Sequence, residues 1–423
     1  MAKSSVISGF YKLPPKQRLA IIKDFAGLTD EEIRILENTG SLPMDVADHM
    51  VENVIGVIPE PLGIGVNFQI NGKDYLIPMA TEEPSVIAAA SYAAKMVRDG
   101  GGFHTSSTAP IMIGQIQVVN IAHAGYAKTQ VLDCKDEILK KANEQDPVLN
   151  SFGGGAKNLD ARVIETSLGQ MLIVHLYVDC RDAMGANAVN TMAEAVSPMI
   201  ERITGGHVYL RIISNLAVKR MAKAWCTVPK EAVGGETIVD GIAYASAFAA
   251  ADPYRAATHN KGAMNGIIAV VLATGNDHRA IEAGGHAYAA FNGAYTTFSK
   301  WTKNKNGDLE GEIELPMAVG LIGGAVKTHP TARIAMKILA VKSANEFAEV
   351  LAAVGLAQNL AALRALSSEG IQRGHMSLHA RNIAITAGAK DELVDQVAER
   401  IVKEHKVRVD RAKEVLEELR KKQ

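Results

Sequence analysis

The sequence has almost no excess of charge of either sign, and it contains few cysteines. Its 423 residues contain 45 Lys and Arg against 46 Asp and Glu, which gives a formal net charge of -1. Because the two signs nearly cancel, no overall field attracts nucleic acid or an anionic membrane, and we expect neither as a partner. The three cysteines, Cys134, Cys180 and Cys226, form no CxxC pair. Their odd number and wide spacing exclude a disulfide framework and argue against structural zinc, so we predict no metal site.

Long apolar runs are also missing. Gly266–Thr274 is among the longest, and it falls well short of the roughly 18 residues that span a bilayer. The first residues, MAKSSVISGFYK, contain no apolar core of a signal peptide. We therefore expect a cytoplasmic protein without a membrane segment.

The common nucleotide-binding and hydrolase motifs are absent as well. Gly63-Ile-Gly65 lacks the third glycine of GxGxxG and precedes a predicted strand, the reverse of the dinucleotide-binding context. The sequence contains no Walker A, HExxH or GxSxG motif. An active site must therefore be sought among polar clusters in apolar or glycine-rich surroundings.

Hydrophobic periodicity predicts an α+β fold with three parts. The elements expected between residues 110 and 220 are, in order, strand 111–119, helix 126–144, strand 161–167, strand 171–179, helix 186–204 and strand 207–214. This β-α-β-β-α-β order is that of a ferredoxin-like domain. We assign residues 1–109 and 221–375 to one large helix-rich domain, into which 110–220 is inserted. Residues 376–423, with apolar positions at helical spacing, are expected to form a small, mobile helical cap.

A hairpin and the helix after it contain the first candidate site residue. Residues on either side of Asn71-Gly72 predict two strands joined by a type I′ turn. Thr81-Glu82-Glu83-Pro84 then leads into an Ala-rich helix, for which Pro84 suits the first position. Two adjacent carboxylates in apolar surroundings raise at least one pKa, as a general acid requires, and this favours Glu83. The alternative is that both acids merely complement the helix dipole.

A second candidate is the segment Asp182-Ala-Met184-Gly185-Ala-Asn187. It follows an apolar strand and opens a helix, so its backbone N–H groups and the helix dipole could hold an anion such as a pyrophosphate. The alternative is that Asp182 only caps the helix.

A third candidate is the polar cluster from Asp252 to Asn265, which includes Lys261. A lysine with other polar groups between apolar runs favours a charged ligand, and Asp277 is placed to return across the helix and pair with it. The alternative is an exposed ion pair of little energetic worth. His375 and His379 can share one helix face, but without a third ligand nearby we assign no metal to them.

Together these clusters resemble the 3-hydroxy-3-methylglutaryl-CoA reductases, specifically the soluble prokaryotic class II. The resemblance rests on six segments in the family's order along practically the whole chain: ENVIG at 52–56, EEPS at 82–85, DAMGAN at 182–187, DPYRAATHNKG at 252–262, GND at 275–277 and GHM at 374–376. A departure is His278, where related proteins commonly carry tryptophan, and we expect it to leave the chemistry intact.

The resemblance implies a large domain that binds a CoA ester and a ferredoxin-like domain that binds the nicotinamide dinucleotide. It also implies reduction of the acyl-CoA thioester to mevalonate and free CoA by two hydrides, or the reverse oxidation. In that reaction Lys261 would stabilise the oxyanion, Asp277 would link it to the proton donor Glu83, and His375 would protonate the CoA thiolate.

The resemblance further implies two sets of binding residues. Substrate-binding positions are Ser85, Arg255, Asn265, Glu52 and Asn53. Dinucleotide-binding positions are Asp182, Met184, Gly185 and Asn187, together with Asp146 as the ribose-discriminating residue. A carboxylate at residue 146 accepts from a 2′-hydroxyl and repels a 2′-phosphate, so we predict NADH, with NADPH as the alternative. The family's active site lies at a subunit interface, with its dinucleotide and acyl-CoA parts contributed by different subunits, which implies a homodimer or a higher multiple of dimers.

Other functions remain open from the residues alone. One is an NAD(P)-dependent reductase of a related acyl-CoA. A ligand-sensing module would explain Asp182–Asn187 but not Glu83, Lys261, Asp277 or His375. A Schiff-base lyase would need a lowered pKa at Lys261, and an Asp277 partner would raise that pKa.

Overall fold

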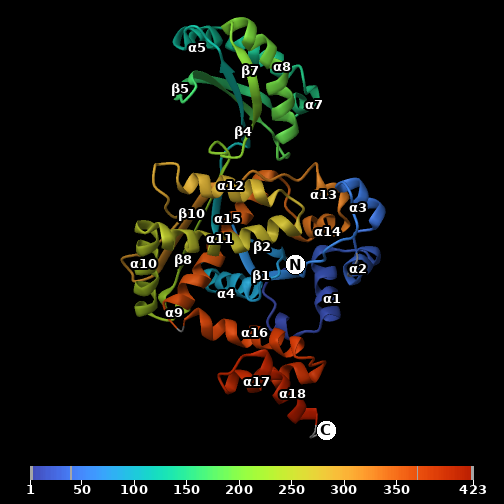
Figure 1. Cartoon of the computed structure of the whole chain (residues 1–423). Helices are drawn as coiled ribbons and strands as arrows, with labels where there is room; N and C mark the ends of the chain where they lie inside the picture. The colour runs from blue at the N-terminus through green and yellow to red at the C-terminus, as the bar shows by residue number, and fades with distance from the viewer. Residues whose placement is uncertain (1–2, 39–40, 369, 421–423) are drawn as a thin grey trace.

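The structure, a computed structural model, describes residues 3–38, 41–368 and 370–420, with residues 371–378 described by their backbone alone. The molecule is elongated and has three parts (Figure 1). A small unit with its own four-stranded sheet lies at one end, a large body of helices and two sheets lies in the middle, and three C-terminal helices lie at the opposite end. Helices and sheets are mixed within the large body, which makes the fold α+β.

Short N-terminal helices pack beside α14 on the large body. They are the 3-10 helix η1 (Phe10–Lys12), α1 (Pro15–Ala26), α2 (Asp30–Glu37) and α3 (Met44–Met50). Ile22 and Leu28 contribute to a core that also contains Ile334 and Ile338. This arrangement anchors the start of the chain to the large body.

The predicted hairpin is confirmed, and it leads into helix α4. Strands β1 (Leu62–Ile70) and β2 (Lys73–Ala80) pair antiparallel, and Asn71 and Gly72 have φ angles of 48° and 76°, both positive as a type I′ turn requires. Helix α4 runs from Val86 to Arg98, so the prediction that Pro84 is the first helical residue is wrong. Ser85 has a left-handed φ of 78°, and a residue in that conformation cannot continue a right-handed helix back to Pro84.

The small unit has the predicted β-α-β-β-α-β order. Its elements are β4 (Ile111–Val119), α5 (Ala124–Asp133), α6 (Lys135–Asn143), α7 (Pro147–Ser151), β5 (Gly155–Thr166), β6 (Gly169–Asp179), α8 (Ala186–Thr204) and β7 (His207–Ser214). The sheet order is β5-β6-β4-β7 and every pairing is antiparallel. The helix predicted at 126–144 is divided at Cys134 into α5 and α6.

The small unit is inserted in the sequence between two strands of the large body's four-stranded sheet. The strands of this sheet are β3 (His104–Ser107), β8 (Met221–Val228), β9 (Ser299–Lys303) and β10 (Leu309–Pro316), in the order β3-β8-β10-β9. β3 and β8 are neighbouring antiparallel strands, and Ser107 lies opposite Ala222. The chain therefore leaves for the small unit and returns from it at adjacent points.

Two long helices cross at the centre of the large body. The helices that follow β8 are α9 (Lys230–Val233), α10 (Glu236–Ala251), α11 (Pro253–Ala273), α12 (His278–Ala289), α13 (Ala325–Thr328), α14 (Pro330–Leu339) and α15 (Ala344–Leu366). A Cβ on Gly355 would lie 2.7 Å from Ile267, and a Cβ on Gly266 would lie 3.0 Å from Gln358, so α11 and α15 approach closely because both positions are glycine. By length and composition α15 could cross a membrane, but 83% of its apolar window is buried, as in the core helix of a globular protein.

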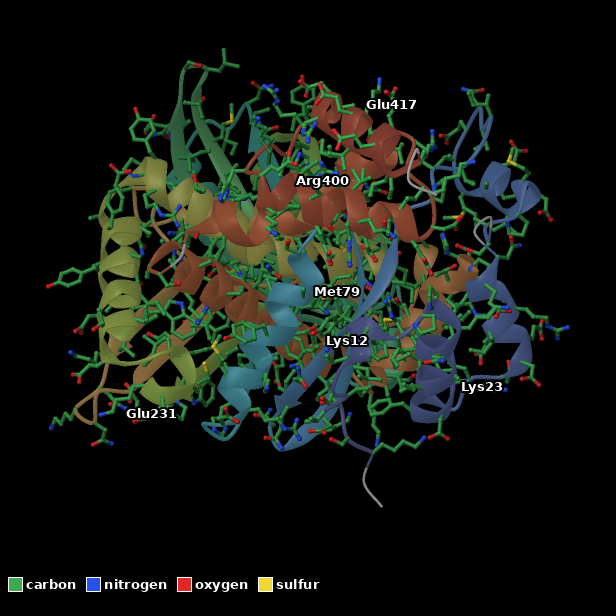
Figure 2. All side chains as sticks on the ribbon, turned by 90° about the horizontal axis from the view of Figure 1, so that it is seen from below. Lys12, Lys23, Met79, Glu231, Arg400 and Glu417 are labelled. Carbon is green, nitrogen blue, oxygen red and sulfur yellow. The ribbon has the colours of Figure 1, made fainter. Side chains whose placement is uncertain are left out.

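The C-terminal helices form a separate cluster. They are α16 (Ile371–Thr386), α17 (Glu392–Lys403) and α18 (Val409–Arg420), and their apolar side chains pack on one another. Seen from this end, Arg400 of α17 lies in front, and Met79 of β2 lies farther back, among the strands of the large body (Figure 2). Helix α16 runs across the boundary that we predicted between residues 375 and 376, so that boundary lies within a helix rather than in a loop.

Candidate active site

Lys261 and Glu83 form an ion pair on the surface of the large body. The Nζ atom of Lys261, in α11, donates to Oε2 of Glu83 at 2.8 Å. Asn265, one helical turn after Lys261, donates to the same oxygen at 3.5 Å. The Lys261 side chain is 61% exposed and that of Glu83 is 32% exposed, so the pair is open to a ligand. Residues predicted from two separate segments, Glu83 in one and Lys261 and Asn265 in the other, are therefore brought together.

The turn before α4 directs Glu83 toward α11. The Glu83 N–H donates to the hydroxyl of Thr81 at 3.2 Å, and Ser85 ends the turn in its left-handed conformation. The first turn of α4 contains no acidic residue, so Glu83 does not belong to that helix. A role in complementing the dipole of α4 alone does not account for the contact of Glu83 with Lys261.

The carboxylate that lies beside Glu82 is Glu60 rather than Glu83. The pKa of Glu60 is raised, mainly by partial burial and to a smaller extent by the nearby Glu82 carboxylate. The His278 side chain acts in the opposite direction. We expected Glu82 and Glu83 to perturb each other, but Glu83 is directed to Lys261. Sequence reasoning missed Glu60, because nothing in its local pattern shows that the segment before β1 returns to Glu82.

Asp277 is the N-cap of α12. Its Oδ1 accepts from the N–H groups of Arg279 and Ala280, both at 3.1 Å, and from Nε of Arg279 at 3.4 Å. We expected this carboxylate to link Lys261 to Glu83. The structure instead gives Lys261 a direct contact with Glu83, and the described hydrogen bonds of Asp277 satisfy the unpaired N–H groups at the start of α12.

Arg255 lies away from this ion pair within one chain. It is six residues before Lys261 on α11, which corresponds to about 9 Å along the axis and about 120° around it. Its neighbour His259 is buried and contacts Ser299 Oγ at 2.6 Å, and burial, with a smaller effect of Arg255, lowers the pKa of His259 to about 4. The polar cluster thus divides, with His259 and Asn260 in the core and Lys261 and Asn265 facing Glu83.

Glu52 and Asn53 lie in the exposed segment between α3 and β1. The described hydrogen bonds and ion pairs include none from their side chains, and Asn53 has a left-handed φ of 58°. Ile55 and Ile58 in the same segment are 100% and 98% exposed. Two fully exposed isoleucines so close together leave an apolar surface that the single chain does not cover.

We call Asp182–Gly185 the β6–α8 turn. Asp182 does not cap α8, because its Oδ1 accepts from the N–H of Ala344, the first residue of α15, at 2.8 Å. Gly185 is the N-cap of α8, and it has a φ of 111° and no side-chain hydrogen bond. Without a side-chain cap, the first N–H groups of this 19-residue helix suit an anionic ligand. Asn187 is exposed in the first turn of α8.

Asp146 lies at the start of α7, shortly before the glycine loop that leads into β5. Its Oδ1 accepts from Leu149 N at 2.8 Å and so caps α7. The glycine loop that follows enters β5 at Gly155, which pairs with Asp179 at the end of β6. A Cβ on Gly154 would lie 2.8 Å from the Asp179 oxygen, so glycine is required there. The glycine loop that follows α7 and the end of β6 therefore meet at one end of the small sheet.

His375 belongs to α16, but its side chain lies outside the described residues. In the part of the chain that the structure describes, no group of three or more His, Cys, Asp or Glu side chains is placed to hold a metal ion.

Residues 14–380 match the family model for hydroxymethylglutaryl-coenzyme A reductase. The chain is 61% identical to the 3-hydroxy-3-methylglutaryl-coenzyme A reductase of Archaeoglobus fulgidus, over 99% of this chain and 96% of that protein. It is 38% identical to a probable reductase of the same name from Borreliella burgdorferi, over 80% and 78% of the two chains.

The fold is similar to solved structures of the same family. The 3-hydroxy-3-methylglutaryl-coenzyme A reductase of Streptococcus pneumoniae superposes with a TM-score of 0.84 at 40% identity, over 97% of this chain and 99% of that chain. A structure of that class II enzyme bound to NADPH in open conformations superposes with a TM-score of 0.83 over 85% of this chain.

Proposed function

This chain belongs to the hydroxymethylglutaryl-CoA reductase family, and we propose that its Lys261–Glu83 pair performs the proton and oxyanion chemistry of that reaction. The enzyme is a nicotinamide-dependent oxidoreductase that converts 3-hydroxy-3-methylglutaryl-CoA to mevalonate and free CoA. The reaction would consume two molecules of reduced nicotinamide dinucleotide, one for the hydride that adds to the thioester carbon and the other for the hydride that adds to the resulting aldehyde.

The observation that carries this proposal is the 2.8 Å contact between Lys261 Nζ and Glu83 Oε2. When hydride adds to the thioester carbon, negative charge develops on its oxygen, and an ammonium group at that position stabilises it. The hemithioacetal then releases CoA as a thiolate, leaving an aldehyde. When the second hydride adds to the aldehyde carbon, Glu83 together with the Lys261 ammonium that donates to it supplies the proton that the aldehyde oxygen takes up.

We assign catalytic roles to Asp277 and His375 because each lies in a segment that resembles a signature segment of the family. Asp277, in Gly275–Asp277, contributes negative charge to the site from the start of α12. His375, in Gly374–Met376, protonates the departing thiolate. In this proposal the C-terminal helices, residues 376–423 with the rest of α16, bring His375 to the site after substrate binds.

We propose that the working enzyme is a homodimer whose sites are each completed by two chains. Ser85 and Asn265 lie beside Glu83, but Arg255 and the segment with Glu52 and Asn53 are not at the Lys261–Glu83 pair of their own chain. A second chain would supply Arg255 to the acyl carboxylate and would cover Ile55 and Ile58, whose exposure supports this assembly.

Two inactive variants test this shared site. Lys261→Ala and Arg255→Ala homodimers are each expected to lack activity, but a mixture exchanged by brief dissociation contains heterodimers with one intact site. Such a mixture should recover roughly one quarter of the wild-type activity. Failure to recover activity, with heterodimers demonstrated by differential tagging, would show that each chain completes its own site.

We propose that residues 110–220 form the dinucleotide-binding domain and 1–109 with 221–375 the acyl-CoA-binding domain of a cytoplasmic enzyme. The uncapped N-terminus of α8, with Asn187 in its first turn, suits the pyrophosphate, and Met184 and Gly185 shape the approach to it. A carboxylate at Asp146, at the start of α7, favours a ribose with a free 2′-hydroxyl, so NADH is the preferred cofactor.

The assay that tests the proposed function uses purified enzyme, 3-hydroxy-3-methylglutaryl-CoA and reduced dinucleotide. Absorbance of the reduced nicotinamide should fall by two equivalents for each equivalent of CoA released. A one-to-one ratio would show that the aldehyde is the final product and would contradict the assignment of Glu83 to the second step.

A further inference from the structure

Two buried polar residues directly precede Lys261 on α11. His259 and Asn260 are 1% and 0% exposed, whereas the other buried residues of this helix are apolar or glycine. A buried polar side chain is costly unless it is hydrogen-bonded, and hydrogen bonds are directional. The partners of these two residues therefore determine how this part of α11 is held.

Asn260 joins α11 to the segment between α12 and β9. Its Nδ2 donates to the backbone oxygen of Thr296 at 2.8 Å and to the hydroxyl of Tyr295 at 3.0 Å, and its Oδ1 accepts from Phe298 N at 3.3 Å. Both N–H groups and the oxygen of the amide are therefore used. An aspartate carboxylate has no N–H group, and leucine has neither a donor nor an acceptor, so asparagine suits this position where residues of similar size do not.

The hydroxyl of Tyr295 is itself held by α12. Nδ1 of His286 lies 2.8 Å from the hydroxyl oxygen, and Nε2 of His286 lies 3.0 Å from Oε2 of Glu282. Both His286 and Glu282 belong to the helix that Asp277 caps. The hydrogen bonds of Asn260 therefore connect α11 with α12, and each of these helices holds a proposed catalytic residue.

His259 makes a second connection, from α11 to β9 and α15. Its Nε2 lies 2.6 Å from Ser299 Oγ, which donates to Asn359 Oδ1 at 3.0 Å. Because the hydroxyl proton of Ser299 goes to Asn359, the histidine donates from Nε2 and its Nδ1 is an acceptor. Among the described residues this buried Nδ1 has no hydrogen-bond partner. Asn260 is fully satisfied and His259 is not, so Asn260 is the more complete anchor.

These anchors matter because α11 is smooth where it meets α15. Its contact face includes Gly266, on which a Cβ would lie 3.0 Å from Gln358. Glycine contributes no ridge to a helix surface, so packing at this point brings the helices close without interlocking them. The directional bonds of Asn260 then fix the rotation of α11 about its axis. Lys261 follows at about 100° around the helix, and its long side chain would move farther than the backbone if α11 rotated.

We propose that Asn260 is a positioning residue that fixes the rotation of α11 and so holds Lys261 Nζ against Glu83 Oε2. This role rests on the proposed function, in which the ion pair acts on the acyl group. Asn260 is wholly buried, so it acts through Lys261 rather than on a reactant. Misplacement of a catalytic group slows the chemical step more than it weakens binding of the substrate.

Zero-length cross-linking with a carbodiimide measures the ion pair directly. The reagent activates the Glu83 carboxylate, and the Lys261 amine in contact with it displaces the activated group to form an amide that mass spectrometry detects. The full-length wild type should give this cross-link, since the Glu83 and Lys261 side chains are 32% and 61% exposed. Asn260→Leu keeps the approximate volume and removes all three hydrogen bonds, so it should give a severalfold lower yield.

Turnover and binding provide the second measurement. In Asn260→Leu, kcat for reduction of the acyl-CoA, per folded enzyme, is expected to fall about 100-fold. The Kd for the acyl-CoA, measured by calorimetric titration, should change much less. Asn260→Ser retains one donor and one acceptor, and is expected to lie between this variant and the wild type in both cross-linking and kcat.

Arg98→Met is the matched control for a general loss of stability. Arg98 pairs with Asp74 at 2.9 Å in the large body, and its described hydrogen bonds reach no residue of α11. This variant should melt at a lower temperature but keep the wild-type cross-link yield and kcat. An equal loss of the cross-link in Arg98→Met and Asn260→Leu would show that any destabilisation loosens the ion pair, and would overturn the specific role of Asn260.

The two measurements also separate the role of Asn260 from its premise. A wild-type cross-link yield in Asn260→Leu, or in Asn260→Ser if the leucine variant does not fold, would overturn that role whatever the turnover. A reduced yield with wild-type kcat would show that the reaction does not need the ion pair. That result would overturn the proposed function and leave Asn260 as the residue that holds Lys261 against Glu83.

Discussion

Glu83 Oε2 accepts a hydrogen bond from Lys261 Nζ across 178 residues of sequence, at a distance of 2.8 Å. The turn between β2 and α4 holds the carboxylate, and the middle of the buried helix α11 holds the ammonium group. Both backbones are fixed by packing on α15, while the two side chains remain accessible. A rigid frame with an open pair of opposite charges suits a substrate oxygen that changes charge twice during one reaction.

Lys261→Ala is expected to abolish thioester reduction while changing the free energy of CoA-ester binding by less than about 1.4 kcal/mol. The lysine acts mainly on charge that develops in the transition state, so the ground state loses little. Steady-state turnover and calorimetric titration with the acyl-CoA measure the two quantities. Substantial turnover in this variant would remove Lys261 from the site.

Asp277→Asn should distinguish the role of this residue as the cap of α12 from the role of its negative charge. Asparagine caps helices as well as aspartate does, so the melting temperature is expected to stay near the wild-type value while turnover falls in both hydride steps. Asp277→Ala should show the same loss of turnover with an additional loss of about 1 kcal/mol of stability. If Asp277→Asn keeps wild-type turnover, capping is the whole role of this residue.

His375→Gln is expected to stall reduction of the acyl-CoA but to reduce free mevaldehyde at a substantial rate, because the aldehyde carries no thiolate to protonate. His379→Gln, altered at an exposed residue of the same helix, should be nearly neutral for both substrates. An equal loss for both substrates in His375→Gln would contradict thiolate protonation. A selective loss in His379→Gln would transfer the role to that histidine.

The ratio of kcat/KM for NADH to that for NADPH is expected to exceed about tenfold, or about 1.4 kcal/mol, in the wild type. Asp146→Asn keeps an oxygen to accept from Leu149 N and removes the charge that repels a 2′-phosphate, so the ratio should fall without loss of stability. Equal kcat/KM values for the two cofactors in the wild type would refute the assignment of Asp146.

Acid should destabilise the fold through His259. Burial lowers the folded-state pKa of this histidine from 6.5 to about 4. Between these values the unfolded chain binds the proton and the folded chain does not. The contribution of neutral His259 to the free energy of unfolding is therefore complete above pH 6.5 and is lost as the pH falls toward 4. The contribution is about 3 kcal/mol, and urea unfolding at several pH values should show a shallower dependence in His259→Gln.

Local sequence patterns predicted much of the fold and the members of the Lys261–Glu83 pair. The Asn71-Gly72 turn and the strand order of the small unit depend on neighbouring residues and on alternation, so short segments contain the information. Asp277 was predicted to pair with Lys261, but a residue before a helix can also cap it, and sequence does not decide between a local and a distant partner. Glu60 and the burial of Asn260 were missed, because their contacts come from segments that only the tertiary fold brings together.

The pairing of β3 with β8 has a consequence for the order in which the protein folds. Closing an unstructured loop of roughly 110 residues between these strands would cost about 4 kcal/mol of chain entropy. In the small unit, however, Ile113 of β4 lies opposite Ser214 of β7, so its folding brings the two flanking segments together before the large-body sheet forms. Pulse-labelling hydrogen exchange during refolding should therefore find β4 and β7 protected before β3 and β8, with the inserted unit acting as the nucleus that closes the sheet around it.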